Sequence, residues 1–408
     1  MVGQWGKEDD EKVVIRCYND LRDIIQMEWV EKSCEIGNDQ TFLFTDTLGD
    51  PLCRIRNTPL STMLVNFSLL SSLGFLFFSL LFLVADVGTK LVGCIQGSVK
   101  PVTFHDKSVN VGYVLGLRVV PPYRRCGIGS ILVRKLEEWF VSHNVDYAYM
   151  ATQKDNDASL GLFVGTLGYT VFRNPAILVN PVNPGRNLKL PSDIVIRKLK
   201  VEEAASWYRT HVAPTTDFFP DDIDQILRNK LSMGTWVAYY NNNDKINSWA
   251  ILSVWNSSKV FKLRIGKAPL SYLLLTKVCN LVGRFLMFLG LTALPDLFST
   301  FGFYFLYGVH AEGPLCGNLV RALCDHVNNM AASDDGGACK VLVVEVDGES
   351  NGGDLMRCVP HWKMLSCDDD TWCIKPLKCE EKMSDLGEFN DMFWKSKSGT
   401  LFVDPRDV

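Results

Sequence analysis

The chain has 408 residues, 47% of them hydrophobic, and its 42 basic against 46 acidic side chains give a formal net charge of −4. This length predicts two domains with sizeable cores, and mild acidity without a basic cluster means that direct nucleic-acid binding is not expected. The 13 cysteines are odd in number and scattered, which excludes a disulfide scaffold; together with a polar start in place of a secretion signal, this predicts a nuclear or cytoplasmic protein.

Strands and helices alternate along the first half of the chain, which predicts an α/β fold. The first expected helix carries Leu21, Ile24, Ile25 and Trp29 at helical spacing. The expected elements are a strand at 13–16, a helix at 20–33, hairpin strands at 63–65 and 91–97, a strand at 109–119, a helix at 127–140, a strand at 147–151, a helix at 158–167 and a strand at 177–179.

Residues 67–85 are a run of 19 residues without a charge, which is long enough to cross a membrane. A single crossing would separate the expected strands at 63–65 and 91–97, and no positive cluster flanks the run. We therefore interpret residues 66–86 as an apolar insertion in a hairpin connection, or as the product of an incorrect gene structure. A membrane anchor is the weaker alternative.

A stretch rich in Asn, Pro and Gly at 181–191 predicts a linker between two domains, 13–180 and 192–380, and residues 381–408 are expected to form an extended tail. The second half repeats the order of elements of the first, which suggests two related α/β domains. Its expected elements are strands at 194–196, 236–240, 248–255, 303–309, 340–346, 362–365 and 372–374, with helices starting at 201 and spanning 315–329.

One motif lies between the apolar strand at 109–119 and the helix that follows it. There Arg124, Gly127 and Gly129 follow an R-x-x-G-x-G pattern. Glycines at such a turn let a pyrophosphate approach backbone N–H groups at a helix N-terminus, and arginines add charge-assisted bonds. The alternative is a glycine-rich helix start with solvated arginines. In this context the motif resembles the acetyl-CoA loop of the GNAT acetyltransferases. The residues that the resemblance assigns to acetyl-CoA are Leu117, Arg118, Val119, Arg124, Arg125, Cys126, Gly127, Ile128, Gly129 and Ser130.

Residues 156–169 resemble the GNAT segment beside the pantetheine arm, which makes Asn156 and Ser159 candidates to bond the cofactor; an ordinary N-capped helix is the alternative. Two features depart from the family. Val164 stands where many GNAT enzymes have a tyrosine that protonates the leaving thiolate, and the strand before the loop carries no acidic residue to act as a base. Tyr113 is the nearest candidate for proton transfer, against the alternative of a half-buried strand tyrosine.

Segments spread over nearly the whole chain resemble the plant Hookless-type probable N-acetyltransferases, except at about 67–86. The resemblance implies a GNAT fold and an acetyl-CoA-dependent N-acetyltransferase that acts in the nucleus in ethylene and auxin control of apical-hook and leaf growth. The segments include 54–57, 113–119, 137–140, 172–181, 217–220, 253–256, 312–314, 360–363 and 402–406.

The second half carries no comparable loop. The turn at 312–317 lies where the first half has its arginines and glycines, but it contains Pro314 and no arginine, so we predict a degenerate GNAT-like domain that packs or recognises. Glu345 is expected to be a paired structural carboxylate. No metal is expected, because the candidate ligands Cys358, His361, Cys367 and Cys373 lack the spacing of a zinc site.

The leading hypothesis is acetyl transfer from acetyl-CoA to an amine, which is a protein lysine, an N-terminus or a small amine. We expect direct attack without a covalent enzyme intermediate, since no Cys/His pair is visible. The alternative is a non-catalytic acetyl-CoA-binding or protein-interaction regulator that retains the fold. Val164 and the missing strand carboxylate favour that alternative.

Overall fold

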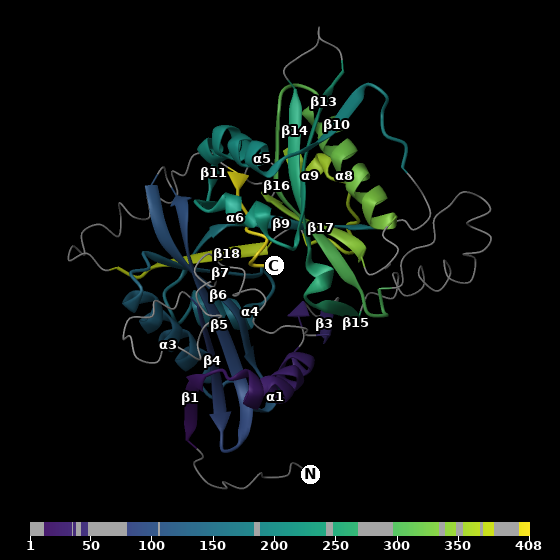
Figure 1. Cartoon of the computed structure of the whole chain (residues 1–408). Coiled ribbons are helices and arrows are strands. Elements are labelled where there is room, and N and C mark those ends of the chain that lie inside the picture. The colour runs from purple at the N-terminus through teal and green to yellow at the C-terminus, as the bar shows by residue number, and fades with distance from the viewer. Residues whose placement is uncertain are drawn as a thin grey trace.

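The computed structural model describes residues 12–34, 36–37, 42–47, 80–104, 107–182, 188–241, 248–267, 297–333, 339–347, 354–367, 370–378 and 400–408. Two mixed β-sheets face each other across a shared core, and the C-terminus lies between them (Figure 1). Helix α3 covers the outer side of the first sheet and helix α8 the outer side of the second. The α/β class predicted from the sequence is confirmed.

The first sheet has the strand order β1-β4-β5-β6-β7-β18-β8. Its first four strands pair antiparallel, β6 and β7 pair parallel, and β18 pairs antiparallel with β7. The elements of this half are β1 (Val13–Cys17), α1 (Asp20–Ser33), β4 (Leu80–Val87), β5 (Lys90–Phe104), β6 (Lys107–Val119), α3 (Ile128–Ser142), β7 (Tyr147–Gln153), α4 (Asp157–Phe163), β8 (Thr170–Arg173) and the distant β18 (Asp370–Pro376).

The second sheet has the order β10-β13-β14-β16-β17-β9 and repeats the pattern: an antiparallel run, one parallel pair (β16 with β17) and a closing antiparallel strand. This repeat supports the predicted relation between the halves. Its elements are β9 (Pro175–Pro181), β10 (Ile194–Leu199), α5 (Val201–Trp207), α6 (Ile223–Arg228), β13 (Ser232–Tyr240), β14 (Trp249–Asn256), β16 (Gly302–Glu312), α8 (Cys316–Ala332), β17 (Cys339–Asp347) and α9 (Asp354–Cys358).

The remaining described strands are short, and short 3-10 or π helices lie at Pro121–Tyr123, Tyr208–Val212, Ala213–Thr215 and Ser257–Lys259. Strands β2 (Ile36–Gly37), β3 (Phe42–Thr47) and β15 (Lys262–Lys267) form a small sheet that joins the halves. Strand β12 (Phe219–Pro220) pairs with β5, and β11 (Thr216–Asp217) pairs with β19 (Thr400–Leu401).

The two halves exchange strands. Strand β9 precedes the predicted linker but pairs with β17 in the second sheet, whereas β18 pairs with β7 and β8 in the first. The boundary at 181–191 therefore does not separate the two sheets. Except for β9 and β18, however, the long strands before it belong to the first sheet and those after it to the second. The predicted strand at 372–374 belongs to the other half's sheet, where it pairs antiparallel with β7 and β8.

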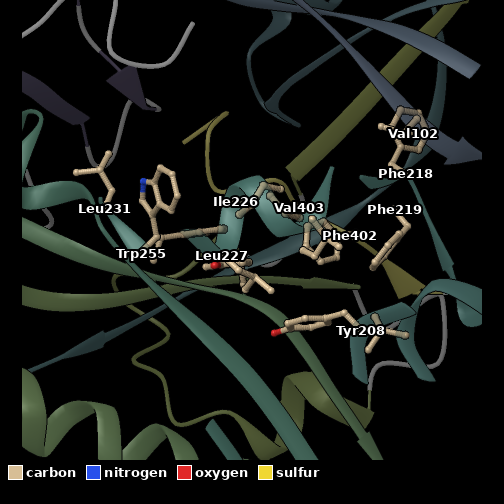
Figure 2. Packing of buried hydrophobic residues seen from close by; sticks show 14 of the residues in the cluster. Val102, Tyr208, Phe218, Phe219, Ile226, Leu227, Leu231, Trp255, Phe402 and Val403 are labelled. Carbon is tan, nitrogen blue, oxygen red and sulfur yellow. The ribbon is translucent and has the colours of Figure 1, made fainter. Parts of the chain in front are cut away.

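The end of the chain is part of the core rather than an extended tail. Phe402 and Val403 are 2% and 5% exposed and pack with residues of both halves. Figure 2 shows them beside Phe219 and above Tyr208. Of the predicted tail 381–408, only residues 400–408 lie in the described part, and these close the space between the sheets.

Part of the run interpreted as an insertion is a core strand. Strand β4 pairs with β1 and β5, and Phe82, Leu83, Val84 and Ala85 are all buried, on alternate faces of the sheet. The interpretation of 66–86 as foreign to the fold is therefore wrong for 80–86, and its apolar character reflects a strand buried in the sheet. The expected strand at 63–65 lies outside the described residues. No helix in the described ranges is long and apolar enough to cross a membrane.

Two further expectations differ from the structure. Helix α1 has the predicted bounds, but Leu21 and Ile25 are 98% and 79% exposed, because the helix packs through Met27, Val30 and the buried carboxylate of Asp23. The Asp23 carboxylate accepts from Arg16 of β1 at 2.5 and 2.8 Å, and this bidentate ion pair lies on the same buried face as Met27 and Val30. The expected strand at 362–365 is a turn.

Candidate active site

Strands β6 and β7 part in the middle of the first sheet. Their pairing runs from Val111 opposite Tyr147 to Tyr113 opposite Tyr149 and stops there. Gly116, at φ 61°, bulges out of β6, which shifts its register against β5. Beyond this point β7 continues beside β18, so residues 114–119 of β6 no longer pair with β7; we call this side of β6 the opening.

The turn after β6 exposes the N-terminus of α3. Gly127 is the N-cap at φ 81°, no side chain caps the helix, and its first turn carries no acidic residue. The helix therefore presents its first N–H groups and its partial positive charge to the opening. This arrangement is typical of phosphate binding, and it fits the pyrophosphate of an acyl-CoA.

The arginines of the loop take different directions. Arg124 and Arg125 are exposed, and Arg124 Nε donates to the last carbonyl of β6, Val119 O, at 2.9 Å. Arg118 instead turns to α1, where its Nε lies 3.5 Å from a carboxylate oxygen of Glu31. Only the backbone of Arg118 therefore borders the opening, together with that of Leu117 and Val119.

The remaining predicted loop residues lie at the start of α3. Cys126 is exposed and its thiol donates to the Arg124 carbonyl, Ile128 is buried in the core, and Gly129 and Ser130 are half-buried. A Cβ on Gly129 would lie 3.4 Å from Leu162 of α4, so this glycine marks the narrow place between the two helices.

Asn156 caps helix α4. Its side chain accepts from Ser159 N at 3.1 Å and donates to Thr152 Oγ1 at 3.1 Å. This matches the N-capped helix that was the alternative interpretation. Val164, just after α4, is 39% exposed.

An ion-pair cluster lies behind the point where β6 and β7 part. The rings of Tyr113 and Tyr149 stack with centroids 4.7 Å apart. The ammonium of Lys100, on β5, is 5.8 and 5.7 Å from the two ring centroids and donates to Asp407 at 2.5 Å. Tyr149 Oη donates to the same carboxylate oxygen of Asp407 at 2.8 Å. The cluster faces the second half of the chain, away from α3.

Sequence reasoning named Tyr113 as a candidate but did not name its neighbours Lys100, Tyr149 and Asp407. One signal was available: Lys100 is a charge in the interior of strand β5, where residues 91–100 are all buried, and a buried charge needs a partner. The partner, Asp407, is 307 positions away in the chain, and no local pattern indicates it.

The second half has a similar parting of strands that its own chain fills. Pairing of β16 with β17 ends at Leu306 opposite Val344, and Gly308 bulges at φ 58°. The small cavity beyond is lined by Glu345 and Asp347 of β17 and by residues 400–403 of the C-terminal segment. Glu345 accepts from Trp372 Nε1 at 2.8 Å and burial raises the pKa of its carboxyl, so its recorded partner is an indole N–H rather than a cation.

The turn before α8 does not reproduce the phosphate loop. A Cβ on Gly317 would meet the Cys358 sulfur at 2.5 Å, so α9 closely covers the start of α8. The described residues contain no group of His, Cys, Asp and Glu side chains that could hold a metal ion.

Known proteins share both the sequence and the fold. The sequence model of the acetyltransferase (GNAT) family matches residues 65–169, a span that includes β4 and the loop before α3. The chain is 40% identical to the probable N-acetyltransferase HLS1 of Arabidopsis thaliana, over 97% of this chain and 99% of that protein. The chain belongs to the GNAT acetyltransferases, in the group of HLS1.

A rice relative and one solved structure extend the comparison. The chain is 35% identical to the acetyl transferase GW6a of Oryza sativa subsp. japonica, over 90% of this chain and 82% of that protein. The N-myristoyltransferase of Saccharomyces cerevisiae, solved with bound myristoyl-CoA, has a TM-score of 0.53 at 10% identity and covers 91% of this chain and 80% of its own. The GNAT fold and the resemblance to the plant proteins are confirmed, and the family implies an acyl-CoA and an amine acceptor.

Proposed function

We propose that the protein transfers an acetyl group from acetyl-CoA to an amine, which is a protein lysine, an N-terminus or a small amine. The observation that carries the proposal is the uncapped N-terminus of α3 next to the parting of β6 and β7. A phosphate site followed by a strand segment that no longer pairs with β7 suits the two parts of coenzyme A.

Each part of the site has a role in this reaction. The N–H groups at the start of α3 and the exposed guanidinium groups of Arg124 and Arg125 bind the pyrophosphate. The backbone at Leu117 and Val119 holds the pantetheine arm and orients the thioester. The amine then attacks the thioester carbonyl directly, and the reaction needs a group that takes up its proton.

A second function, acetyl-CoA binding without turnover, is favoured by Val164. This side chain has no proton to give to a leaving thiolate, and a regulator that only binds acetyl-CoA needs none. The two functions differ in whether bound acetyl-CoA is consumed when an amine is added.

The phosphate loop is tested by calorimetry of acetyl-CoA binding to the full chain. Arg124→Ala removes a charge, and Gly129→Trp fills the narrow place between α3 and α4, so we expect each to weaken binding at least about tenfold. Arg134→Ala removes an exposed arginine further along the same helix and serves as the matched control. Wild-type affinity in both loop variants would refute the assignment of the loop.

The biological setting is also part of the proposal. We infer from the resemblance to the Hookless-type proteins that the enzyme acts in plant growth controlled by ethylene and auxin, in the nucleus or cytoplasm, without binding nucleic acid itself. Fluorescence microscopy of the tagged full chain tests the location, and exclusion from both compartments would contradict it.

A further inference from the structure

The C-terminal segment places carboxylates where the strand before the phosphate loop has none. Asp404 and Asp407 both contact the ammonium of Lys100, at 3.2 and 2.5 Å. Lys100 and Asp404 are 2% and 3% exposed, so the pair is closed off from bulk water. Residues more than 300 positions from β5 thus complete the environment of Tyr113 and Tyr149.

Asp407 lies directly behind the point where β6 and β7 part. Tyr149 is the last residue of β7 paired with β6, and its hydroxyl donates to Asp407 Oδ2 at 2.8 Å. Tyr113, the paired residue on β6, stacks on Tyr149 and is partly exposed. Paired residues of neighbouring strands project from the same face of a sheet, so both rings extend from the parting toward the C-terminal segment.

We propose that Asp407 is the proton acceptor of the transfer reaction and receives the proton of the attacking amine through the hydroxyl group of Tyr149. The proposal rests on the proposed function, because it assigns a step of that reaction. It gives the C-terminal segment a chemical role in addition to its place in the core.

The protons and electron pairs of this step balance. The acceptor arrives as an ammonium ion and gives one proton to the Tyr149 oxygen while Tyr149 gives its own to Asp407. The freed lone pair forms the C–N bond with the thioester carbonyl carbon, and the C–S bond breaks with its electron pair remaining on sulfur. The second proton that nitrogen loses goes to this thiolate, and Asp407 later releases its proton to water.

The two carboxylates differ in a way that selects Asp407. Arg406 donates to Asp404 at 2.9 and 2.6 Å, and Asp222 holds the same guanidinium at 2.6 and 3.0 Å. Asp404 is therefore bound by two cations, Arg406 and Lys100. Although burial acts against it, the charges of Arg406 and Lys100 hold the pKa of Asp404 below its usual range. Burial raises the pKa of Asp407, against the opposing charge of Lys100, and the charge of Asp404 raises it further. Asp407 is therefore the member of the pair that can take up a proton.

The groups that face Asp407 come from four elements. They are Lys100 of β5, Tyr149 of β7, Glu345 of β17 and Asp404 of the same segment. Burial also raises the pKa of Tyr149 and of Glu345. Tyr149 therefore stays protonated as Asp407 titrates, and the Asp407→Asn variant separates the titration of Asp407 from that of Glu345 on the acid side of the rate profile.

The test measures kcat against pH for the full chain, with acetyl-CoA and a short peptide that has one lysine and a free N-terminus. In the wild type, kcat falls as pH falls through the raised pKa of Asp407, because the protonated carboxyl accepts no proton. Asp407→Asn removes this acid limb and lowers kcat at pH 7.5 by about 100-fold or more. Tyr149→Phe, which keeps the ring, lowers kcat in the same direction, and neither changes acetyl-CoA affinity more than about twofold.

Asp404→Asn is the matched control from the same segment. It removes a negative charge that raises the pKa of Asp407, so the acid limb persists and moves to lower pH. If the cluster is only structural, Asp407→Asn, Tyr149→Phe and Asp404→Asn lower the stability of the protein and leave the acid limb of the kcat profile at the same pH. That result overturns the proposal. An Asp407→Asn protein with an intact acid limb and wild-type kcat also overturns it while leaving the transfer reaction standing. A wild-type protein that binds acetyl-CoA and never consumes it refutes the proposed function itself, and this step with it.

Discussion

The turn before α3 passes through the left-handed region at two residues, Arg125 at φ 65° and Gly127 at φ 81°. Glycine adopts this conformation without a steric cost, whereas another residue is strained by about 1 kcal/mol or more. Gly127 therefore keeps the loop tight at the point where the helix N-terminus opens to the site.

Replacing Gly127 and Gly161 by alanine measures the free-energy cost of a left-handed backbone conformation at sites where a methyl group has room. A Cβ would meet nothing within 4 Å at Gly127 or at Gly161 of α4, but only Gly127 has a positive φ. We expect Gly127→Ala to lower the free energy of unfolding by about 1 kcal/mol and Gly161→Ala to raise it by about 0.5 kcal/mol. Urea denaturation measures both, and equal effects would show that the conformation of the turn costs nothing.

At the scale of elements, β4 shows that a run of residues without charges can be a strand buried within a sheet. The residues of β4 lie between β1 and β5, and α3 covers one face, so charges are excluded except at Asp86, which accepts from Arg16 at 2.7 Å. A membrane span and a buried strand share the same composition, because both remove side chains from water. Pairing with β5 is the observation that distinguishes them.

Replacing one leucine in β4 and one in α1 tests this assignment. Leu83 is 6% exposed in the core, and Leu21, which the helical spacing placed on the inner face, is 98% exposed. We expect Leu83→Ala to lower the free energy of unfolding by about 2 to 4 kcal/mol and Leu21→Ala to change it by less than about 0.5 kcal/mol. Thermal unfolding followed by circular dichroism measures both, and a neutral Leu83→Ala would restore the interpretation as an insertion.

At the scale of the whole molecule, the halves depend on each other. Strands β9 and β18 each complete the sheet of the other half, and Phe402 and Val403 fill the core between them. A strand edge left without its neighbour exposes unpaired peptide groups and apolar side chains. The repeat of topology therefore does not mean that each half folds alone.

Fragments cut at the linker test this dependence. We expect residues 1–182 and 183–408 to be insoluble or unfolded when produced separately, and to form a soluble complex when produced together. Far-ultraviolet circular dichroism and gel filtration report the result. A folded, monomeric first fragment would show that β18 is dispensable and that the boundary in the sequence is also a boundary of the fold.

The sequence by itself determined the class, the approximate positions of many helices and strands, and the loop before α3, because these depend on periodicity and on residues close together in the chain. Helix α1 illustrates the limit: its bounds follow from local signals, while its buried face is the one that carries Met27, Val30 and Asp23, the partner of Arg16 on β1. Only the tertiary structure decided that β4 is core, that the halves exchange strands, and that Asp407 meets Lys100 and Tyr149. Those contacts join residues far apart in the chain, and which distant groups meet is set by the packing of whole sheets rather than by any local pattern.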